Sequence, residues 1–278
     1  MNNWLLDDFL IRALVEDTGG GDITTESCVS SDSLAAAKLY AKGGGVVCGL
    51  EVAARVFALA DVSVVFTAHI PEGGTVQTGG LIATAEGPAR ALLTAERTAL
   101  NLLQRMSGIA TATAAAVQAV RGTKARIADT RKTVPGLRAL DKYAVRAGGG
   151  HNHRFNLADG VLIKDNHIAA AGGIAAAVAM ARRNVSHTLK IEVETETLAQ
   201  VREALDAGAD IIMLDNMHNN TMAEAVRFVD GRALTEASGN MGEKDLAAVA
   251  ATGVDIISIG ALTHTVTALD ISMKLELL

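Results

Sequence analysis

The most regular pattern in the chain is the alternation of apolar runs and helical segments in its second half. Each run is short and typical of a buried strand, and the segments between the runs have helical spacing. The runs cover residues 125–128, 161–163, 189–193, 210–214, 232–237 and 255–259. Alternating strands and helices indicate a parallel sheet with right-handed crossovers. Six strands are too few for a full eight-stranded barrel, so we predict an incomplete α/β barrel.

The first half of the chain has a different pattern, with short strands and many turns. Apolar spacing between Trp4 and Leu14 predicts a helix that ends at the glycines of residues 19–21, and residues 22–25 are predicted to form a turn. Short strands are predicted at residues 35–41, 46–48, 62–69 and 81–86, with a helix over 50–60. This pattern predicts a small α/β sandwich, similar to the hammerhead around lipoyl and biotinyl groups. No lysine stands at the expected hairpin tip, which argues against a carrier function.

A long Ala-rich helical region over residues 89–120 connects the two patterns, and Ser107-Gly108 is expected to interrupt it. We therefore predict an N-terminal α/β sandwich domain over residues 1–108. A catalytic domain, the incomplete α/β barrel, follows over residues 109–278. The last residues of this second domain either stay with the barrel or pack back on the N-terminal domain.

Composition narrows the classes of partner and the compartment. A net charge of -6 argues against nucleic acid as a ligand. No apolar run approaches the roughly 18 residues needed to cross a bilayer, and Asp7 and Asp8 do not suit a signal peptide. Cys28 and Cys48 match no zinc pattern and are expected to be reduced thiols. We expect a soluble, cytoplasmic protein with no nucleic-acid or membrane partner.

Positive charge gathers between residues 129 and 167 of this acidic chain. Arg131-Lys132 follows one predicted strand, His153-Arg154 follows a run of glycines, and Lys164 follows the next strand. The carboxyl ends of parallel strands are where α/β proteins bind ligands. Arginine side chains bind both oxygens of carboxylates and phosphates. A basic surface loop would explain one such pair, but three clusters within forty residues favour an anion site.

Acidic and small residues follow the later strands. Glu194 and Asp215 are expected at the same edge of the sheet, where carboxylates hold magnesium or accept hydrogen bonds from sugar hydroxyls. Either acid is alternatively a buried structural residue. Glu236, the small residues of 238–240 and Gly260-Ala261 end the last strands, and small residues leave backbone N–H groups for a phosphate. His264 is either a phosphate contact or a residue that begins a helix.

Several familiar motifs are missing from the sequence. It contains neither a P-loop nor a Rossmann glycine motif, and no Ser-His-Asp arrangement or zinc-type His/Cys cluster stands out. The long motifs that are present resemble those of the quinolinate phosphoribosyltransferases, and they extend in order over nearly the whole chain. They are residues 16–17, 21–25, 96–101, 107–111, 129–137, 142–145, 148–154, 162–167, 192–194, 213–216, 236–240 and 260–264.

The resemblance implies an activity, a cofactor and an assembly. Enzymes of this family transfer phosphoribose from phosphoribosyl pyrophosphate to quinolinate and form nicotinate mononucleotide, carbon dioxide and pyrophosphate in NAD biosynthesis. Mg²⁺ is the implied cofactor. The implied assembly is a homodimer, or a multiple of dimers, with shared active sites. The N-terminal domain of one subunit would cover the barrel mouth of the other.

The resemblance also implies a role for individual residues. Those expected to bind quinolinate are Arg97, reaching across the subunit interface, and Thr130, Arg131, His153, Arg154 and Lys164. Those expected to bind phosphoribosyl pyrophosphate are Lys132, Lys164, Asp165, Glu194, Asp215, Ser238, Gly239, Asn240, Gly260, Ala261 and His264. Lys132, Glu194 and Asp215 are expected to be catalytic. Glu194 and Asp215 would hold Mg²⁺, directly or through water and substrate.

Three alternative functions are distinguished by sequence features or by products. A molybdenum-transport-associated paralogue of the same fold would lose the signatures at 153–154 and 164–167, which this chain keeps. A nicotinate phosphoribosyltransferase binds one carboxylate, needs fewer cations and releases no carbon dioxide. A non-catalytic phosphate-binding protein would have no reason to keep Glu194 and Asp215 beside Lys132.

Overall fold

The chain folds into two compact units in a computed structural model that describes residues 3–278, with side chains from residue 6 onward. The first unit comprises the residues up to Ala112 together with Ala139–Gly148 and Val266–Leu278. The second comprises Thr113–Arg138 and Gly149–Thr265. The side chains of Trp4 and Leu5, which the sequence pattern assigned to the apolar face of the first helix, lie outside the described residues.

A four-stranded antiparallel sheet, in the order β12-β1-β5-β3, organises the first unit. Its strands are β1 (Leu34–Ala41), β3 (Val65–Ala68), β5 (Leu81–Pro88) and β12 (Ile271–Leu277), and a separate pair is formed by β2 (Gly45–Val46) and β4 (Thr75–Val76). Strand β12 is made by the last residues of the chain and pairs with β1 from Ala41↔Ile271 to Ala35↔Leu277. The last strand of the chain, β12, is therefore an edge strand of the sheet that contains β1.

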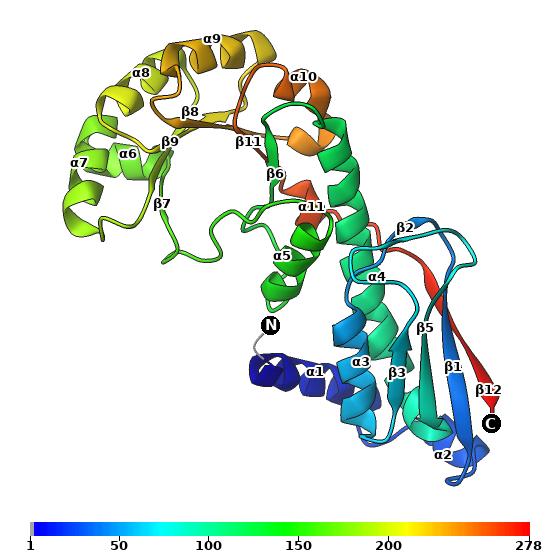
Figure 1. Cartoon of the computed structure of the whole chain (residues 1–278). Coiled ribbons are helices and arrows are strands. Elements are labelled where there is room, and N and C mark those ends of the chain that lie inside the picture. Colours follow the sequence, from blue (N-terminus) through cyan, green and yellow to red (C-terminus); the bar gives the residue numbers. More distant parts are fainter. Residues whose placement is uncertain (1–2) are drawn as a thin grey trace. The chain divides into compact units, whose positions relative to one another are not determined.

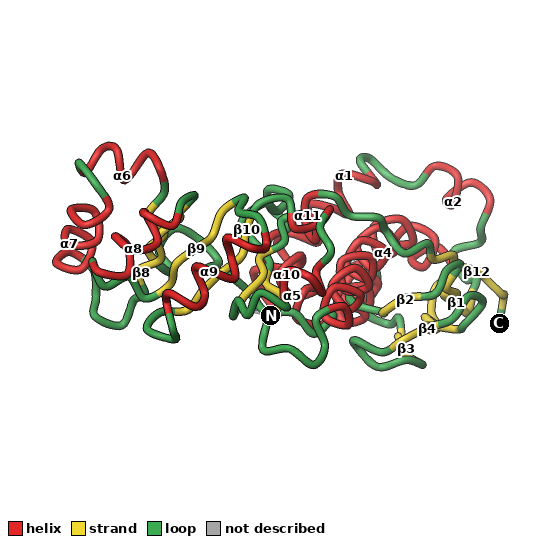
Figure 2. The backbone as a smooth tube through the Cα atoms, turned by 90° about the horizontal axis from the view of Figure 1, so that it is seen from above, coloured by secondary structure: helices red, strands yellow, loops and turns green. Residues whose placement is uncertain are grey.

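The helices of the first unit bury apolar residues at helical spacing. They are α1 (Asn3–Thr18), α2 (Ile23–Cys28), α3 (Leu50–Ala60), most of α4 (Ala89–Ala119) and α5 (Arg138–Ala147). Six residues of α4 in this unit are fully buried at spacings of three and four: Leu92, Ala95, Ala99, Leu103, Met106 and Ala110. On α3, Phe57 is fully buried and stacks on Phe66 of β3 with ring centroids 6.1 Å apart. Figure 2 shows α4 running beside the strands of this unit.

Two local predictions for this unit are wrong. Helix α4 is continuous through Ser107-Gly108, although a break was expected there. The Ser107 hydroxyl accepts a hydrogen bond from the Cys48 N–H at 3.0 Å, and a β-carbon at Gly108 would collide with the backbone of Thr267. The pair therefore serves close packing inside the helix. Residues 22–25 begin α2 instead of forming a turn, because Asp22 caps that helix by accepting the Thr25 N–H at 3.0 Å.

The second unit contains the predicted parallel sheet, in the order β6-β11-β10-β9-β8-β7. Its strands are β6 (Arg126–Ala128), β7 (Val161–Ile163), β8 (Ile191–Thr195), β9 (Ile211–Asp215), β10 (Leu234–Ser238) and β11 (Ile256–Ser258). Each strand begins and ends within two residues of the predicted run. The prediction of an incomplete barrel with six parallel strands is confirmed.

Helices follow the strands of the second unit in the way a crossover connection requires. They are α6 (Asp165–Ala171), α7 (Ile174–Asn184), α8 (Leu198–Asp206), α9 (Asn219–Val229), the 3-10 helix η1 (Met241–Glu243), α10 (Leu246–Ala250) and α11 (Ala261–His264). Figure 1 shows α7, α8 and α9 in a row along the outer side of the strands. Strands β6 and β7 are the two edges of this sheet, and one parallel bridge, Ala128↔His151, ties the loop after α5 to β6.

No helix among the described residues is long and apolar enough to cross a membrane.

Candidate active site

A cavity of about 670 Å³ lies at the carboxyl ends of the parallel strands. We call it the mouth cavity. Its lining comes from the ends of the strands and the loops that follow them: Thr130, Arg131, Lys132, His153, Arg154, Lys164, Glu194, Met213, Asp215, Asn216, Glu236, Ser238, Gly239, Asn240, Met241, Gly242, Glu243, Ser258, Gly260, Ala261, His264 and Thr265. Most of the residues that the sequence assigned to substrates are therefore brought together in one place.

Two of the assigned residues, Arg97 and Asp165, are not part of this lining. Arg97 belongs to the first unit, where its side chain is exposed and pairs with Glu96 at 3.2 Å. Asp165 is the first residue of α6 and is exposed, and its carboxylate accepts the Asn166 N–H at 2.7 Å. A negative charge at this position suits the positive end of the helix, which is a structural role.

One electrostatic feature of the mouth cavity is the approach of like charges. Burial and the neighbouring Arg131 guanidinium lower the pKa of Arg154 below its usual value. The Nε atom of Arg131 is buried and has no hydrogen-bond partner within the protein. Two guanidinium groups that repel one another at a half-buried site are stabilised when an anion lies between them. The cavity is therefore built for a ligand with negative charge.

Asp129 holds the loop that carries His153 and Arg154. It lies directly after β6, is fully buried, and accepts the His153 N–H at 2.8 Å and the Asn152 amide at 2.6 Å. At the far side of the loop, Arg154 donates to the Gly160 carbonyl at 2.9 Å. A buried carboxylate that accepts several hydrogen bonds fixes the backbone around it, so Asp129 positions the loop.

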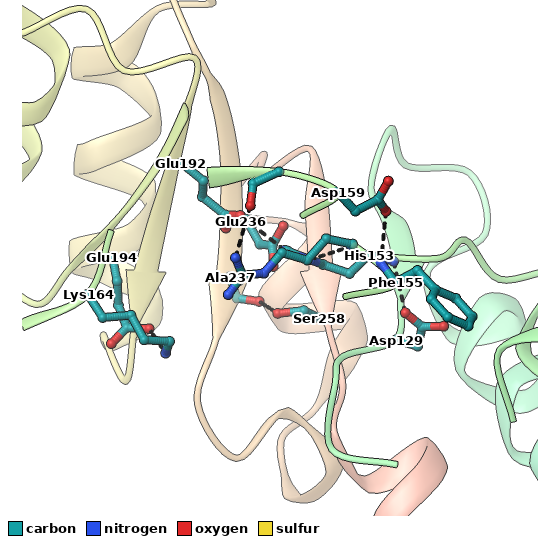
Figure 3. A network of polar contacts seen from close by, with 12 residues as sticks. Asp129, His153, Phe155, Asp159, Lys164, Glu192, Glu194, Glu236, Ala237 and Ser258 are labelled. Carbon is teal, nitrogen blue, oxygen red and sulfur yellow. Dashed lines mark hydrogen bonds and ion pairs between the residues drawn. The ribbon is translucent and has the colours of Figure 1, made fainter. Parts of the chain in front are cut away.

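The His153 ring lies against two buried carboxyl groups, those of Glu192 and Glu236 (Figure 3). Its Nε2 atom is 3.1 Å from Glu192 Oε2 and 3.5 Å from Glu236 Oε1, while its Nδ1 atom accepts the Arg154 N–H at 2.8 Å. Because Nδ1 is an acceptor, the ring proton in this geometry is on Nε2. Glu192 and Glu236 are only 3% and 1% exposed. Burial, and then the charge of Glu192, raise the pKa of Glu236, and His153 offsets part of that rise.

This pair of buried acids received little weight in the interpretation of the sequence, although a signal was present. Side chains alternate between the two faces of a strand, so Glu192 and Glu194 on β8 point to the same face. Assigning Glu194 to the cavity therefore also placed Glu192 inside the barrel. Glu236 was expected at the end of its strand but lies in the middle of β10, beside Met213 of β9.

Glu194 and Asp215 have partners of their own at the rim of the cavity. Lys164 donates a hydrogen bond to Glu194 (Figure 3), and Asp215 accepts one from the Asn216 amide at 2.7 Å. Neither acid belongs to a group of three close metal-binding side chains among the described residues. Two carboxylates nevertheless suit Mg²⁺, which is usually bound by one or two carboxylates together with substrate phosphates and water.

Small residues shape the turns after β10 and β11. Gly239 has a φ of +94°, and a β-carbon there would collide with the backbone and side chain of Asn216. A β-carbon at Gly260 would come within 3.0 Å of Lys132 Cδ and 3.1 Å of the His264 ring. Glycine therefore lets the Lys132 side chain cross this turn and lie beside His264.

Comparison with known proteins identifies the family of this chain. The family model "Quinolinate phosphoribosyl transferase, C-terminal domain" matches residues 109–274, and the corresponding N-terminal model matches residues 22–107. A probable nicotinate-nucleotide pyrophosphorylase [carboxylating] of Bacillus subtilis is 47% identical over 277 residues, covering 100% of this chain and 96% of that protein. A quinolinate phosphoribosyltransferase [decarboxylating] of Nicotiana tabacum is 42% identical, covering 95% of this chain and 80% of that protein.

The solved structures agree with the sequence relatives. The nicotinate-nucleotide pyrophosphorylase from Francisella tularensis superimposes with a TM-score of 0.95 at 38% identity, covering 99% of this chain and 98% of that one. The family models together span most of the chain, and the solved structure shares its fold. The chain belongs to the quinolinate phosphoribosyltransferase family.

Proposed function

We propose that the mouth cavity carries out the decarboxylating phosphoribosyl transfer of this family. The ring nitrogen of quinolinate attacks C1 of phosphoribosyl pyrophosphate, pyrophosphate leaves, and loss of the C2 carboxylate as carbon dioxide gives nicotinate mononucleotide. One observation carries the proposal. Arg131 and Arg154 repel each other in a half-buried cavity that also contains Lys132 and Lys164, and two polyanionic substrates would neutralise this charge.

We assign quinolinate to the end of the cavity where the guanidinium groups meet. Arg131 and Arg154 offer paired donors to its two carboxylates, and the unpartnered Nε of Arg131 supports this assignment. Lys164 and Thr130 lie in the same lining. Both ring nitrogens of His153 have partners in the protein. A direct hydrogen bond from His153 to a substrate carboxylate would have to replace one of them.

Phosphoribosyl pyrophosphate is assigned to the rim. Lys132 and His264 lie together at the turn after β11, where they would bind phosphate oxygens. The turns at 238–240 and 260–261 would bind the 5-phosphate through the backbone. Glu194 and Asp215 would accept hydrogen bonds from the ribose hydroxyls. They would also stabilise the positive charge that develops at C1 as pyrophosphate leaves.

Mg²⁺ would bind in this arrangement together with the pyrophosphate group of the substrate. Glu194 and Asp215 would hold it, directly or through water, and it would neutralise the charge of the leaving group. The contribution of the protein's own residues is to position two polyanions and to exclude water, and no covalent intermediate is required. Once the pyridine nitrogen carries ribose, its positive charge stabilises the electron pair left at C2.

The proposal also covers the role of Arg97 and the cellular compartment of the protein. Arg97 is exposed on α4 of the first unit and would reach quinolinate in the site of a second subunit, so the enzyme would be a homodimer or a multiple of dimers. Cys28 and Cys48 are both free thiols, which suits a reducing compartment such as the cytoplasm.

A coupled assay with quinolinate, phosphoribosyl pyrophosphate and Mg²⁺ tests the function. Nicotinate mononucleotide, carbon dioxide and pyrophosphate should appear in equal amounts. Reactions that lack one substrate, or that contain a chelator, provide the controls. Formation of a pyridine nucleotide without carbon dioxide, or no nucleotide at all, would refute the proposal.

A further inference from the structure

The reaction requires a proton at C2 of the pyridine ring, and the assignments above give this step to no residue. Quinolinate carries a carboxylate at C2, whereas nicotinate mononucleotide carries hydrogen there. When the bond between C2 and the carboxylate breaks, carbon dioxide leaves and the electron pair remains on C2. One proton must reach that carbon. This inference rests on the proposed function and concerns the source of the proton.

Glu236 lies between the mouth cavity and a second cavity. The second one, of about 520 Å³, is at the amino ends of the same strands, and we call it the rear cavity. First residues of strands, such as Arg126, Ile211 and Ile256, line it. Glu236 lines both cavities, whereas Glu192 lines the rear cavity and not the mouth cavity. A carboxyl group at this position can reach the substrate on one side and exchange protons on the other.

The surroundings of Glu236 favour its protonated form. Its Oε1 atom is buried without a hydrogen-bond partner, and the Glu192 carboxyl is close to it: the ligand atoms of His153, Glu192 and Glu236 all lie within 4.8 Å of one another. The His153 N–H points to this pair but cannot satisfy both acids fully, because it is 3.1 Å from Glu192 and 3.5 Å from Glu236. Two buried carboxylates close together are costly, and a proton shared by the pair removes that cost. The raised pKa of Glu236 agrees with this geometry.

Other charged groups around Glu236 act at longer range. The charged and titratable groups that line one or both cavities with it are His151, His153, Arg154 and Asp159 in the loop after α5, Arg126 on β6, Arg131 and Lys132 after β6, Lys164 after β7, Lys190, Glu192 and Glu194 at β8, Asp215 at the end of β9, Glu243 after β10, and His264 after β11. Arg131 and Arg154 are the cations assigned to the substrate carboxylates. When the substrate is bound their charge is neutralised, so it does not ionise Glu236.

We propose that Glu236 is the acid that protonates C2 of the pyridine ring. As carbon dioxide leaves, the electron pair on C2 takes the proton from the Glu236 carboxyl group, which becomes a carboxylate. Water in the rear cavity then returns a proton to Glu236 before the next turnover. Glu192 and His153 are positioning residues that keep Glu236 protonated and correctly oriented.

The variant Glu236→Gln tests the proposal, because it keeps the size and polarity of the side chain and removes the acidic proton. Product formation should fall about 100-fold, and pyrophosphate release should run ahead of nicotinate mononucleotide formation. In an equal mixture of H₂O and D₂O, NMR of the product measures the hydrogen-to-deuterium ratio at C2. That ratio should differ from the wild-type ratio, because the proton then comes directly from water. A structural defect would slow the reaction without changing the ratio.

Glu192→Gln is the matched control, since it removes the other acid beside His153. Without the Glu192 charge the pKa of Glu236 falls, so the loss of activity at alkaline pH should begin at a lower pH. The isotope ratio at C2 should match the wild-type ratio. The control also decides the question if Glu236→Gln does not fold, because an unchanged pH profile in Glu192→Gln would overturn the proposal.

Failure of this proposal can be distinguished from failure of the proposed function. Wild-type rate and isotope ratio in Glu236→Gln would mean that another group donates the proton. If the wild-type enzyme releases no carbon dioxide from quinolinate, the proposed function itself is wrong.

Discussion

The two ends of the parallel sheet both carry charged residues but use them differently. At the amino ends, Asp210 precedes β9 and Asp255 precedes β11, each within an Asp-Ile-Ile sequence. Asp210 accepts the Ile191 N–H at 2.8 Å, which connects the start of β9 to β8. Asp255 accepts the Thr235 N–H at 2.8 Å, which connects the start of β11 to β10. Both aspartates also pair with cations of the surrounding surface.

At the carboxyl ends, Lys164 and Glu194 form an ion pair, but other charged groups lack enough partners within the protein. Arg131 and Arg154 repel each other, and an Arg131 nitrogen lacks a partner. Charges that are paired within the protein stabilise the fold, whereas charges held together without enough partners lower stability and increase affinity for a ligand. The comparison therefore predicts that substitutions at one end change stability and substitutions at the other change activity.

The largest expected effect concerns the substrate. Nicotinate lacks the C2 carboxylate, so it leaves one guanidinium of the Arg131–Arg154 pair without a partner in the half-buried site. A site built to bind a polar group rejects an analogue without it by about 10⁴-fold. We expect kcat/KM for nicotinate to be lower than for quinolinate by about this factor. Comparable values of kcat/KM for the two substrates would show that the cations at the carboxyl ends have another purpose.

Lys132→Ala should have the next largest effect. Removing a cation that faces the leaving pyrophosphate typically lowers kcat by about 10²- to 10³-fold. The unfolding free energy should hardly change, because the Lys132 side chain is exposed. Lys124→Ala is the matched control at the amino ends, where Lys124 pairs with Asp255 at 2.7 Å. It should keep near-normal kcat. Near-normal turnover in Lys132→Ala at saturating substrates would remove Lys132 from the mechanism.

The parallel strands and the residues at the rim of the mouth cavity could be predicted from the sequence, whereas the buried acids and the continuous helix α4 could not. The six parallel strands were predictable because buried strands of this type are short apolar runs, and the rim residues were predictable because they follow those runs. Glu192 and Glu236 received little weight, because the sequence does not show that the two acids are buried beside each other and beside His153. The helix through Ser107-Gly108 was mispredicted, because the sequence does not show that Thr267 packs there.

A third prediction concerns the subunit that completes the site. Arg97→Ala and Lys132→Ala should each have little activity alone, and if Arg97 acts across a dimer interface the two variants should complement each other when they are mixed. When subunits exchange at random, about half of the dimers are mixed and each mixed dimer has one intact site. Activity should therefore return to about a quarter of the wild-type value. If exchange is shown independently and no activity returns, Arg97 acts within its own chain.

The smallest expected effect tests the amino ends. Asp255→Asn removes the charge that pairs with Lys124 and weakens the hydrogen bonds to Thr235, so it should lower the unfolding free energy by about 1–2 kcal/mol. The value of kcat should stay near that of the wild type. Urea unfolding followed by circular dichroism measures the first quantity. Asp215→Asn at the opposite end is the matched control and should lose activity at unchanged stability.

The pH dependence of stability sharpens this last prediction. Burial alone would raise the pKa of Asp255, but hydrogen bonds from Lys124 and Thr235 outweigh it and lower the pKa in the folded state. The contribution of Asp255 is therefore complete above the unfolded pKa of about 4 and is lost as the pH falls toward the lower folded pKa. Asp255→Asn should differ from the wild type at neutral pH and approach it in acid. A difference that stays constant down to strongly acidic pH would mean that the ionised carboxylate does not hold β10 and β11 together.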